Sequence, residues 1–185
     1  MASTINATTS SGIVATADNT GQLALQAAGT TIATVSSTGM AVLGVTDGSN
    51  AASGIVGEYA VSTVASPGIT LSGSTAANIT SLSLTAGDWD VTGSVYFTGS
   101  STTSTLNWIM GNVQTTSASL GAGNPGMLIQ TLMNNGIWTQ TDTGGVCGPT
   151  RFSLTTTTTI YLVTRAGYTG GTVQSYGQIR ARRIR

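Results

Sequence analysis

The fold is decided by the stretch Ser81-Leu82-Ser83-Leu84-Thr85-Ala86-Gly87-Asp88-Trp89-Asp90-Val91-Thr92-Gly93-Ser94-Val95-Tyr96-Phe97. In its first run leucines alternate with serines, which is the period of two expected of a half-buried strand. In its second run one face carries only Trp89, Val91, Gly93, Val95 and Phe97. Successive side chains of a strand point to opposite sides, so the polar residues fall on the other face. We therefore expect the run 89–98 to form a wall of the hydrophobic core.

The composition of the whole chain agrees with β-structure. The chain has 185 residues, is rich in threonine, and is only 6% charged, against about 25% in typical soluble domains. Threonine and small polar residues suit strands and turns and fit long helices poorly. The sequence therefore predicts an all-β protein.

The low charge also bears on assembly. Six arginines balance six acids, so the formal net charge is zero. A free monomer with so few charges is prone to association and precipitation. We expect the chain to associate in a controlled way, as a homotrimer.

Residues 1–50 predict an attachment or stalk segment. Short strand-like pieces at 13–15, 22–26, 31–35 and 40–43 recur about every ten residues and are separated by glycine-containing turns. They are too short and too few to build a core alone. Three copies wound around a common axis would bury their apolar residues, and so would a segment that clasps another protein. Residues 1–11 are polar, and we expect only a partner to order them.

The composition of residues 46–54 indicates a linker. The strand pattern of residues 55–185 predicts a separate tip domain. Its expected strands are 56–64, 68–72, 78–84, 89–98, 104–115, 127–133, 150–155, 158–166 and 172–183. We expect a tight turn at Ala65-Ser66-Pro67-Gly68, a glycine-rich loop at 144–149 and a bend at Thr155–Thr159. Short strands with regular turn signals predict an antiparallel β-sandwich, most simply a jelly roll.

The charges are segregated along the chain. All six acids precede Arg151, and all six arginines lie at or after it. We expect Asp88 and Asp90 to form inter-strand or inter-subunit salt bridges with late arginines such as Arg180 and Arg182. The terminal arginines could instead contact nucleic acid, but no aromatic platform or basic helix accompanies them, so we expect no nucleic-acid partner.

Catalytic chemistry has little support. Asp88 and Asp90 are the only paired carboxylates, about 6.6–7 Å apart on one strand face, a separation that overlaps that of inverting glycosidases. Cys147 would need a base to act as a nucleophile, and the chain has no histidine. We predict no enzyme activity, no catalytic residues, no metal site and no cofactor. No apolar run approaches transmembrane length, so we expect no membrane partner.

A sugar contact is the remaining candidate site. Trp138 follows a predicted hairpin turn at 134–137 and is expected near a loop, which makes it our candidate for a glycan contact. Trp89 and Trp108 are instead expected to lie in the core or at an interface.

The chain resembles a family of virion proteins on the residues that follow. The segment Ala17-Asp18-Asn19-Thr20-Gly21-Gln22-Leu23-Ala24-Leu25-Gln26-Ala27-Ala28-Gly29-Thr30-Thr31-Ile32-Ala33-Thr34-Val35 looks like the N-terminal attachment segments of tailed-bacteriophage proteins. The block Leu84-Thr85-Ala86-Gly87-Asp88-Trp89-Asp90-Val91 and the run Thr158–Val163 resemble the jelly-roll tips of short trimeric fibres and capsid decoration proteins. These tips are similar in plan to tumour-necrosis-factor heads and the globular heads of complement. No collagen-like or heptad shaft is present.

The resemblance implies a homotrimer in the virion, on the capsid surface or the tail. Residues 1–50 would contact other virion proteins and the tip would be exposed. The first hypothesis is a structural fibre or decoration protein. The second is a receptor-binding tail-fibre tip that recognises a host cell-surface glycan. The third is a polysaccharide hydrolase that uses Asp88 and Asp90.

Overall fold

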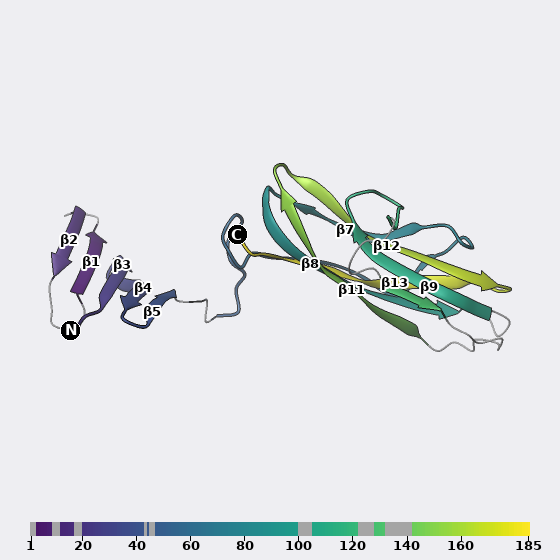
Figure 1. Ribbon diagram of the computed structural model, residues 1–185, viewed down its shortest axis with the longest axis horizontal. Helices are drawn as coiled ribbons and strands as arrows, with labels where there is room; N and C mark the ends of the chain where they lie inside the picture. Colours follow the sequence, from purple (N-terminus) through teal and green to yellow (C-terminus); the bar gives the residue numbers. More distant parts are fainter. Residues whose placement is uncertain are drawn as a thin grey trace. The chain divides into compact units, whose positions relative to one another are not determined.

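The chain forms two compact units, Met1–Ser49 and Asn50–Arg185. The computed structural model describes residues 3–8, 12–16, 20–42, 44, 47–99, 105–121, 128–131 and 142–185. Every regular element in this part of the chain is a strand (Figure 1). The prediction of an all-β protein is therefore confirmed, and its physical reason is the threonine-rich, alternating sequence.

The first unit is a single five-stranded sheet in the order β2-β1-β3-β4-β5. Its strands are β1 (Ser3–Thr8), β2 (Gly12–Thr16), β3 (Leu23–Ala27), β4 (Thr30–Ser36) and β5 (Gly39–Val42). All neighbours are antiparallel except β1 and β3, which are parallel. The structure thus gives the polar segment 3–8 strand partners within its own chain, where we expected order from another molecule.

The second unit is a sandwich of two four-stranded sheets, in the orders β11-β8-β13-β6 and β10-β9-β12-β7. The strands are β6 (Tyr59–Thr70), β7 (Ala77–Leu84), β8 (Gly87–Gly99), β9 (Thr105–Gln114), β10 (Leu128–Thr131), β11 (Thr143–Leu154), β12 (Thr158–Thr169) and β13 (Val173–Arg183). Every pair in both sheets is antiparallel. Eight antiparallel strands in two sheets with this order make a jelly roll, as predicted.

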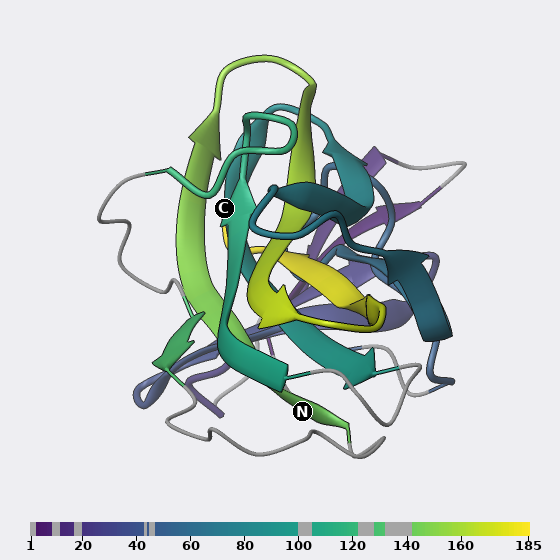
Figure 2. The ribbon, with the colours of Figure 1, turned by 90° about the vertical axis from the view of Figure 1, so that its right-hand side faces the viewer.

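Most connections of the jelly roll cross from one sheet to the other. The bend after β11 carries the chain from one layer to the opposite one, and Figure 2 shows it as an arch over the sandwich. The short link between β7 and β8 also crosses, so these two consecutive strands do not pair with each other. The bend expected at Thr155–Thr159 is confirmed for residues 155–157, where the chain leaves β11 and enters β12.

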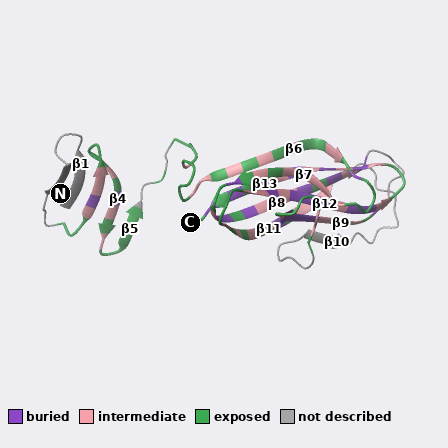
Figure 3. Cartoon of the chain, turned by 90° about the horizontal axis from the view of Figure 1, so that it is seen from above, coloured by how far each residue is buried: buried purple, intermediate pink, exposed green. Residues whose placement is uncertain are grey.

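The core lies between the two sheets and contains the predicted face of β8. Its largest fully buried side chains include Trp89, Phe97, Leu84, Ile109 and Ile160. Along β8 the odd-numbered residues from Trp89 to Gly99 are all buried, and the even-numbered ones from Asp90 to Thr98 are not (Figure 3). The alternation in the sequence therefore placed this strand correctly.

Two predicted breaks are wrong, and both fall on edge strands of the same sheet. We expected a turn at residues 65–68, but β6 runs through it with a register shift opposite Ser175 and Gly177. We expected a loop at 144–149, but β11 runs through it with a register shift between Cys147 and Thr150. Glycine and proline are tolerated at bulges of edge strands, because the outer side of such a strand needs no hydrogen-bond donor.

Candidate functional site

Asp88 is held by two arginines at one end of the sheet. Arg151 forms a bidentate ion pair with Asp88, in which Nε donates to Oδ1 and Nη2 donates to Oδ2, both at 2.7 Å. Arg185 adds a bond from its Nε to Oδ2 at 2.8 Å. These contacts cover the Asp88 side chain, although it lies on the solvent side of β8. The partners of Asp88 are therefore Arg151 and Arg185, whereas we expected late arginines such as Arg180 and Arg182.

The pairing sets the charge state of this carboxyl. The hydrogen bonds from Arg151, assisted by those from Arg185, lower the pKa of Asp88 from 3.8 to about 2. A glycosidase acid needs the opposite shift, because it must hold a proton near neutral pH. Asp88 is ionised and occupied by arginines, so it is poorly suited to the acid role of the hydrolase hypothesis.

Asp88→Asn is expected to make folding less sensitive to acid. A carboxyl with a lower pKa in the folded than in the unfolded state stabilises the fold above its unfolded pKa. For Asp88 that contribution is present above about pH 4 and is lost as the pH falls through about 2. Melting temperatures of the wild type and the variant should therefore converge between these values. Profiles that stay parallel over this range would contradict the assignment.

A second group of contacts, centred on Arg183, lies at the same end of the core. Arg183 is the last inward-facing residue of β13 and is only 4% exposed. Its Nε donates to Glu58 at 2.9 Å, and its Nη1 donates to the Ala86 carbonyl at 2.8 Å. Its guanidinium lies over the Trp89 ring, 4.4 Å from the centroid. Sequence reasoning missed this residue, because an arginine at the end of a basic strand looks like a surface charge.

The outer face of the sheet β11-β8-β13-β6 is a candidate functional surface. We define it by the outward side chains Tyr59, Val61, Asp90, Thr92, Tyr96, Val146, Tyr176, Gln178, Arg180 and Arg182, which come from all four strands. Four of them are exposed large hydrophobic residues, namely Tyr59, Val61, Tyr96 and Val146, the last of which is 60% exposed. Exposed apolar side chains that gather on one face often mark a contact surface.

Two tyrosines stack near one end of this face. Tyr96 and Tyr176 are cross-strand partners, with ring centroids 5.3 Å apart and planes at 17°. The Tyr176 hydroxyl donates to Asp142 at 2.8 Å. Burial, followed by the hydrogen bond to Asp142, raises the pKa of Tyr176 to about 12. The neutral Tyr176 ring and its stacked partner Tyr96 present an aromatic surface on this face.

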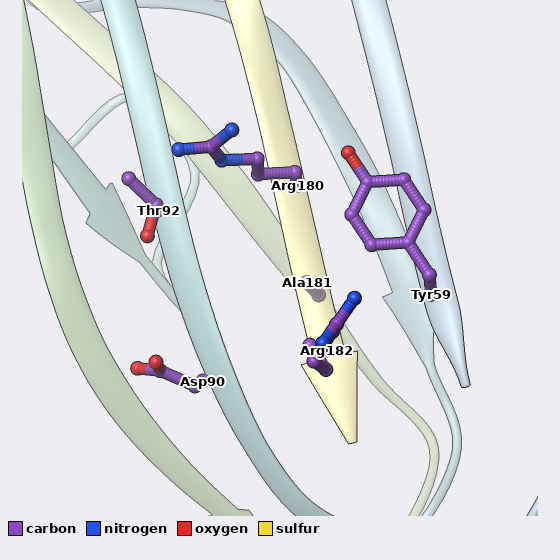
Figure 4. Close-up of a pocket in the computed structure, with 6 residues that line it drawn as sticks. All are labelled: Tyr59, Asp90, Thr92, Arg180, Ala181 and Arg182. Atoms are coloured by element: carbon purple, nitrogen blue, oxygen red, sulfur yellow. The ribbon is translucent and has the colours of Figure 1, made fainter. Parts of the chain in front are cut away.

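A shallow hollow of about 240 Å³ lies toward the other end of this face. Asp90 and Thr92 of β8, Arg180 and Arg182 of β13 and Tyr59 of β6 line it (Figure 4). Arg182 is the register partner of both Asp90 and Tyr59, yet the Asp90 carboxylate points away from β13 and Arg182 leans toward Tyr59. In the described structure none of Asp90, Arg180 and Arg182 forms an ion pair within its own chain.

The other residues singled out by the sequence do not line this hollow where the structure describes them. Trp138 and the predicted hairpin turn at 134–137 fall outside the described residues. Trp89 is in the core, as predicted, whereas Trp108 is half-buried beneath the Arg165 guanidinium. Cys147 is buried in β11. Among the residues that the structure describes there is no cluster of three or more metal-ligating side chains. The same residues include no helix that is long and apolar enough to cross a membrane.

Comparison with known proteins gives only distant structural matches. No family model matches the chain, and no curated protein matches it. The crystal structure of the infectious bursal disease virus VP2 subviral particle aligns over 68% of this chain and 30% of its own, at 15% identity and a TM-score of 0.35. The structure of the Gt strain of that virus aligns over 95% and 40%, at 16% identity and a TM-score of 0.32. The structure of the Gx strain aligns over 68% and 29%, at 13% identity and a TM-score of 0.34.

Proposed function

We propose that the chain is a structural component of a bacteriophage virion, a short trimeric fibre or a capsid decoration protein. In this proposal the unit Met1–Ser49 attaches to the particle, and the jelly roll is the exposed tip. The observation that carries the proposal is that all the described strands of the first unit lie in one sheet, with no second layer among the described residues of that unit.

The burial of the first unit supports this role. Its described side chains include only two buried hydrophobic residues, Ala24 and Ala33, while Ile32 is 49% and Met40 is 66% exposed. A sheet becomes stable by packing one face on another layer. The described residues of the first unit supply no such layer, so another molecule is the natural source. The particle surface, or two further copies of the chain, would supply the missing contacts.

The second unit has the complementary property, because it is complete by itself. Its two sheets enclose a core that includes Trp89, Val95, Phe97 and Leu162, all of which are buried. A self-sufficient domain joined to an incomplete sheet is the arrangement expected of an anchored tip. The trimer itself is proposed from the low charge of the chain.

Removal of residues 1–49 tests the anchor. We expect the remaining protein to fold with strand-rich circular dichroism and a cooperative melt, and to be absent from purified particles. Asn50 should be kept, because its side chain accepts a hydrogen bond from the Tyr59 backbone N–H at 2.8 Å. A matched control carries the full chain with Met40→Ser, which changes one exposed side chain of the sheet and should weaken occupancy only in part. Truncated protein that decorates particles at normal occupancy would overturn the proposal.

The position of the protein in the particle separates the two non-enzymatic hypotheses. Antibody labelling of intact particles at the head supports a decoration protein. Labelling at the distal end of the tail supports the receptor-binding alternative, in which the tip recognises a host surface glycan. Particles that carry no label at either place contradict both.

A further inference from the structure

Most charged side chains of the second unit have an ion-pair or hydrogen-bond partner, and those without one lie together in one place. In the described part of this unit the acids and arginines with a partner are Glu58, Asp88, Asp142, Arg151, Arg165, Arg183 and Arg185. The three that remain are Asp90, Arg180 and Arg182, and they lie side by side around one hollow. In a chain that is only 6% charged, three unpaired charges in one place call for a partner.

The two outer faces of the sandwich also differ in their exposed hydrophobic residues. Four exposed large hydrophobic residues lie on the outer face of β11-β8-β13-β6, as described above. On the opposite sheet, β7, β9 and β12 have no exposed large hydrophobic residue among their described side chains. The apolar surface and the unpaired charges therefore occur together on one sheet, and both are missing from the described side chains of β7, β9 and β12 in the other.

We propose that the outer face of β11-β8-β13-β6 is the surface through which copies of this chain associate, with Asp90 of one copy paired to Arg180 and Arg182 of its neighbour. This inference rests on the proposed function for the existence of an oligomer and adds the surface and its charge pairs. The tyrosines and valines of the face supply the buried apolar area, and the charges set the register.

Charge complementarity favours a second copy of this chain as the partner that binds this face. The hollow presents one carboxylate and two guanidinium groups, so a small anion bound by the arginines would also meet the carboxylate of Asp90. A surface that carries both signs satisfies all three groups, and the face itself is such a surface. In a closed ring each copy offers its carboxylate to one neighbour and its arginines to the other. Pairs of this kind fix partner choice and register, because a misplaced copy brings like charges together.

Charge exchange in the full-length protein tests the pairing. Sedimentation velocity at micromolar concentration should show an oligomer for the wild type. Asp90→Arg and Arg182→Asp alone should each weaken association at least about tenfold, since each places like charges opposite one another. The combined variant Asp90→Arg/Arg182→Asp should recover most of the wild-type association. Ser83→Arg, an exposed position on the opposite sheet, is the control and should leave the oligomer unchanged.

The outcomes separate the surface from the oligomer. A wild-type monomer would overturn the trimer of the proposed function, and with it this inference. A wild-type oligomer that survives both single exchanges would overturn only the surface. Weakening by each exchange without recovery in the combined variant would overturn the charge pairing. Oligomers unaffected by exchange, together with heparin binding that Arg182→Asp abolishes, would assign the face to an acidic saccharide instead. Circular dichroism melts of all variants show whether each has folded.

Discussion

Trp89→Ala is expected to unfold the jelly roll or to lower its melting temperature severely. Trp89 is 1% exposed and is among the largest fully buried side chains of the chain. Its Nε1 donates to the Thr85 carbonyl at 2.9 Å, so the indole is fixed at both its apolar and its polar end. Truncation of a large buried aromatic costs about 3–5 kcal/mol, against a total domain stability of about 5–15 kcal/mol.

The neighbouring residue provides the control for this variant. Asp90→Asn, one position along β8 and on the opposite face, should change the free energy of unfolding of the single jelly roll by about 1 kcal/mol or less, because Asp90 forms no ion pair within the described part of its own chain and exposed charges contribute little. Thermal melts followed by circular dichroism compare the two variants. A stable Trp89→Ala protein would show that the indole is not part of the core. Glycan cleavage by the wild type that Asp90→Asn abolishes without loss of fold would instead revive the hydrolase hypothesis.

Arg183→Met is expected to have the second largest effect. The substitution keeps an apolar stem over Trp89 but removes the guanidinium from Glu58 and from the Ala86 carbonyl. Removal of one partner of a buried ion pair costs about 3–5 kcal/mol, and we expect the lower part of this range, because Glu58 keeps the Gly54 N–H as a donor at 2.8 Å. Denaturant unfolding at equal protein concentration measures the loss.

The same substitution at an exposed arginine separates burial from charge. Arg151→Met also removes one guanidinium from an ion pair, but the Arg151 side chain is 57% exposed and Asp88 keeps Arg185. Its effect on the unfolding midpoint should be much smaller than that of Arg183→Met. Equal effects at the two positions would mean that Arg183 is not a buried anchor of this end of the core.

The functional residues were only partly predictable from the sequence. Asp88, Asp90 and a basic C-terminal strand were visible in the sequence, and ion pairs between them were expected. The partners of each charge were not visible, because Asp88 and Arg151 are 63 positions apart and meet only when β11 lies beside β8. Arg180 and Arg182 were expected to pair with Asp88 or Asp90, yet within the chain Asp88 pairs with Arg151 and Arg185.

Local patterns by themselves determined the all-β class, the core face of β8 and the bend before β12. Each depends on residues within a few positions of one another, and side-chain alternation is a local property of the strand. Only the tertiary structure decided that β7 and β8 belong to opposite sheets and that β6 and β11 continue through proline and glycine. It also decided that Arg183 turns inward. These outcomes depend on which distant strands lie alongside, since an edge position tolerates a proline and a charge can be buried only where its partners converge.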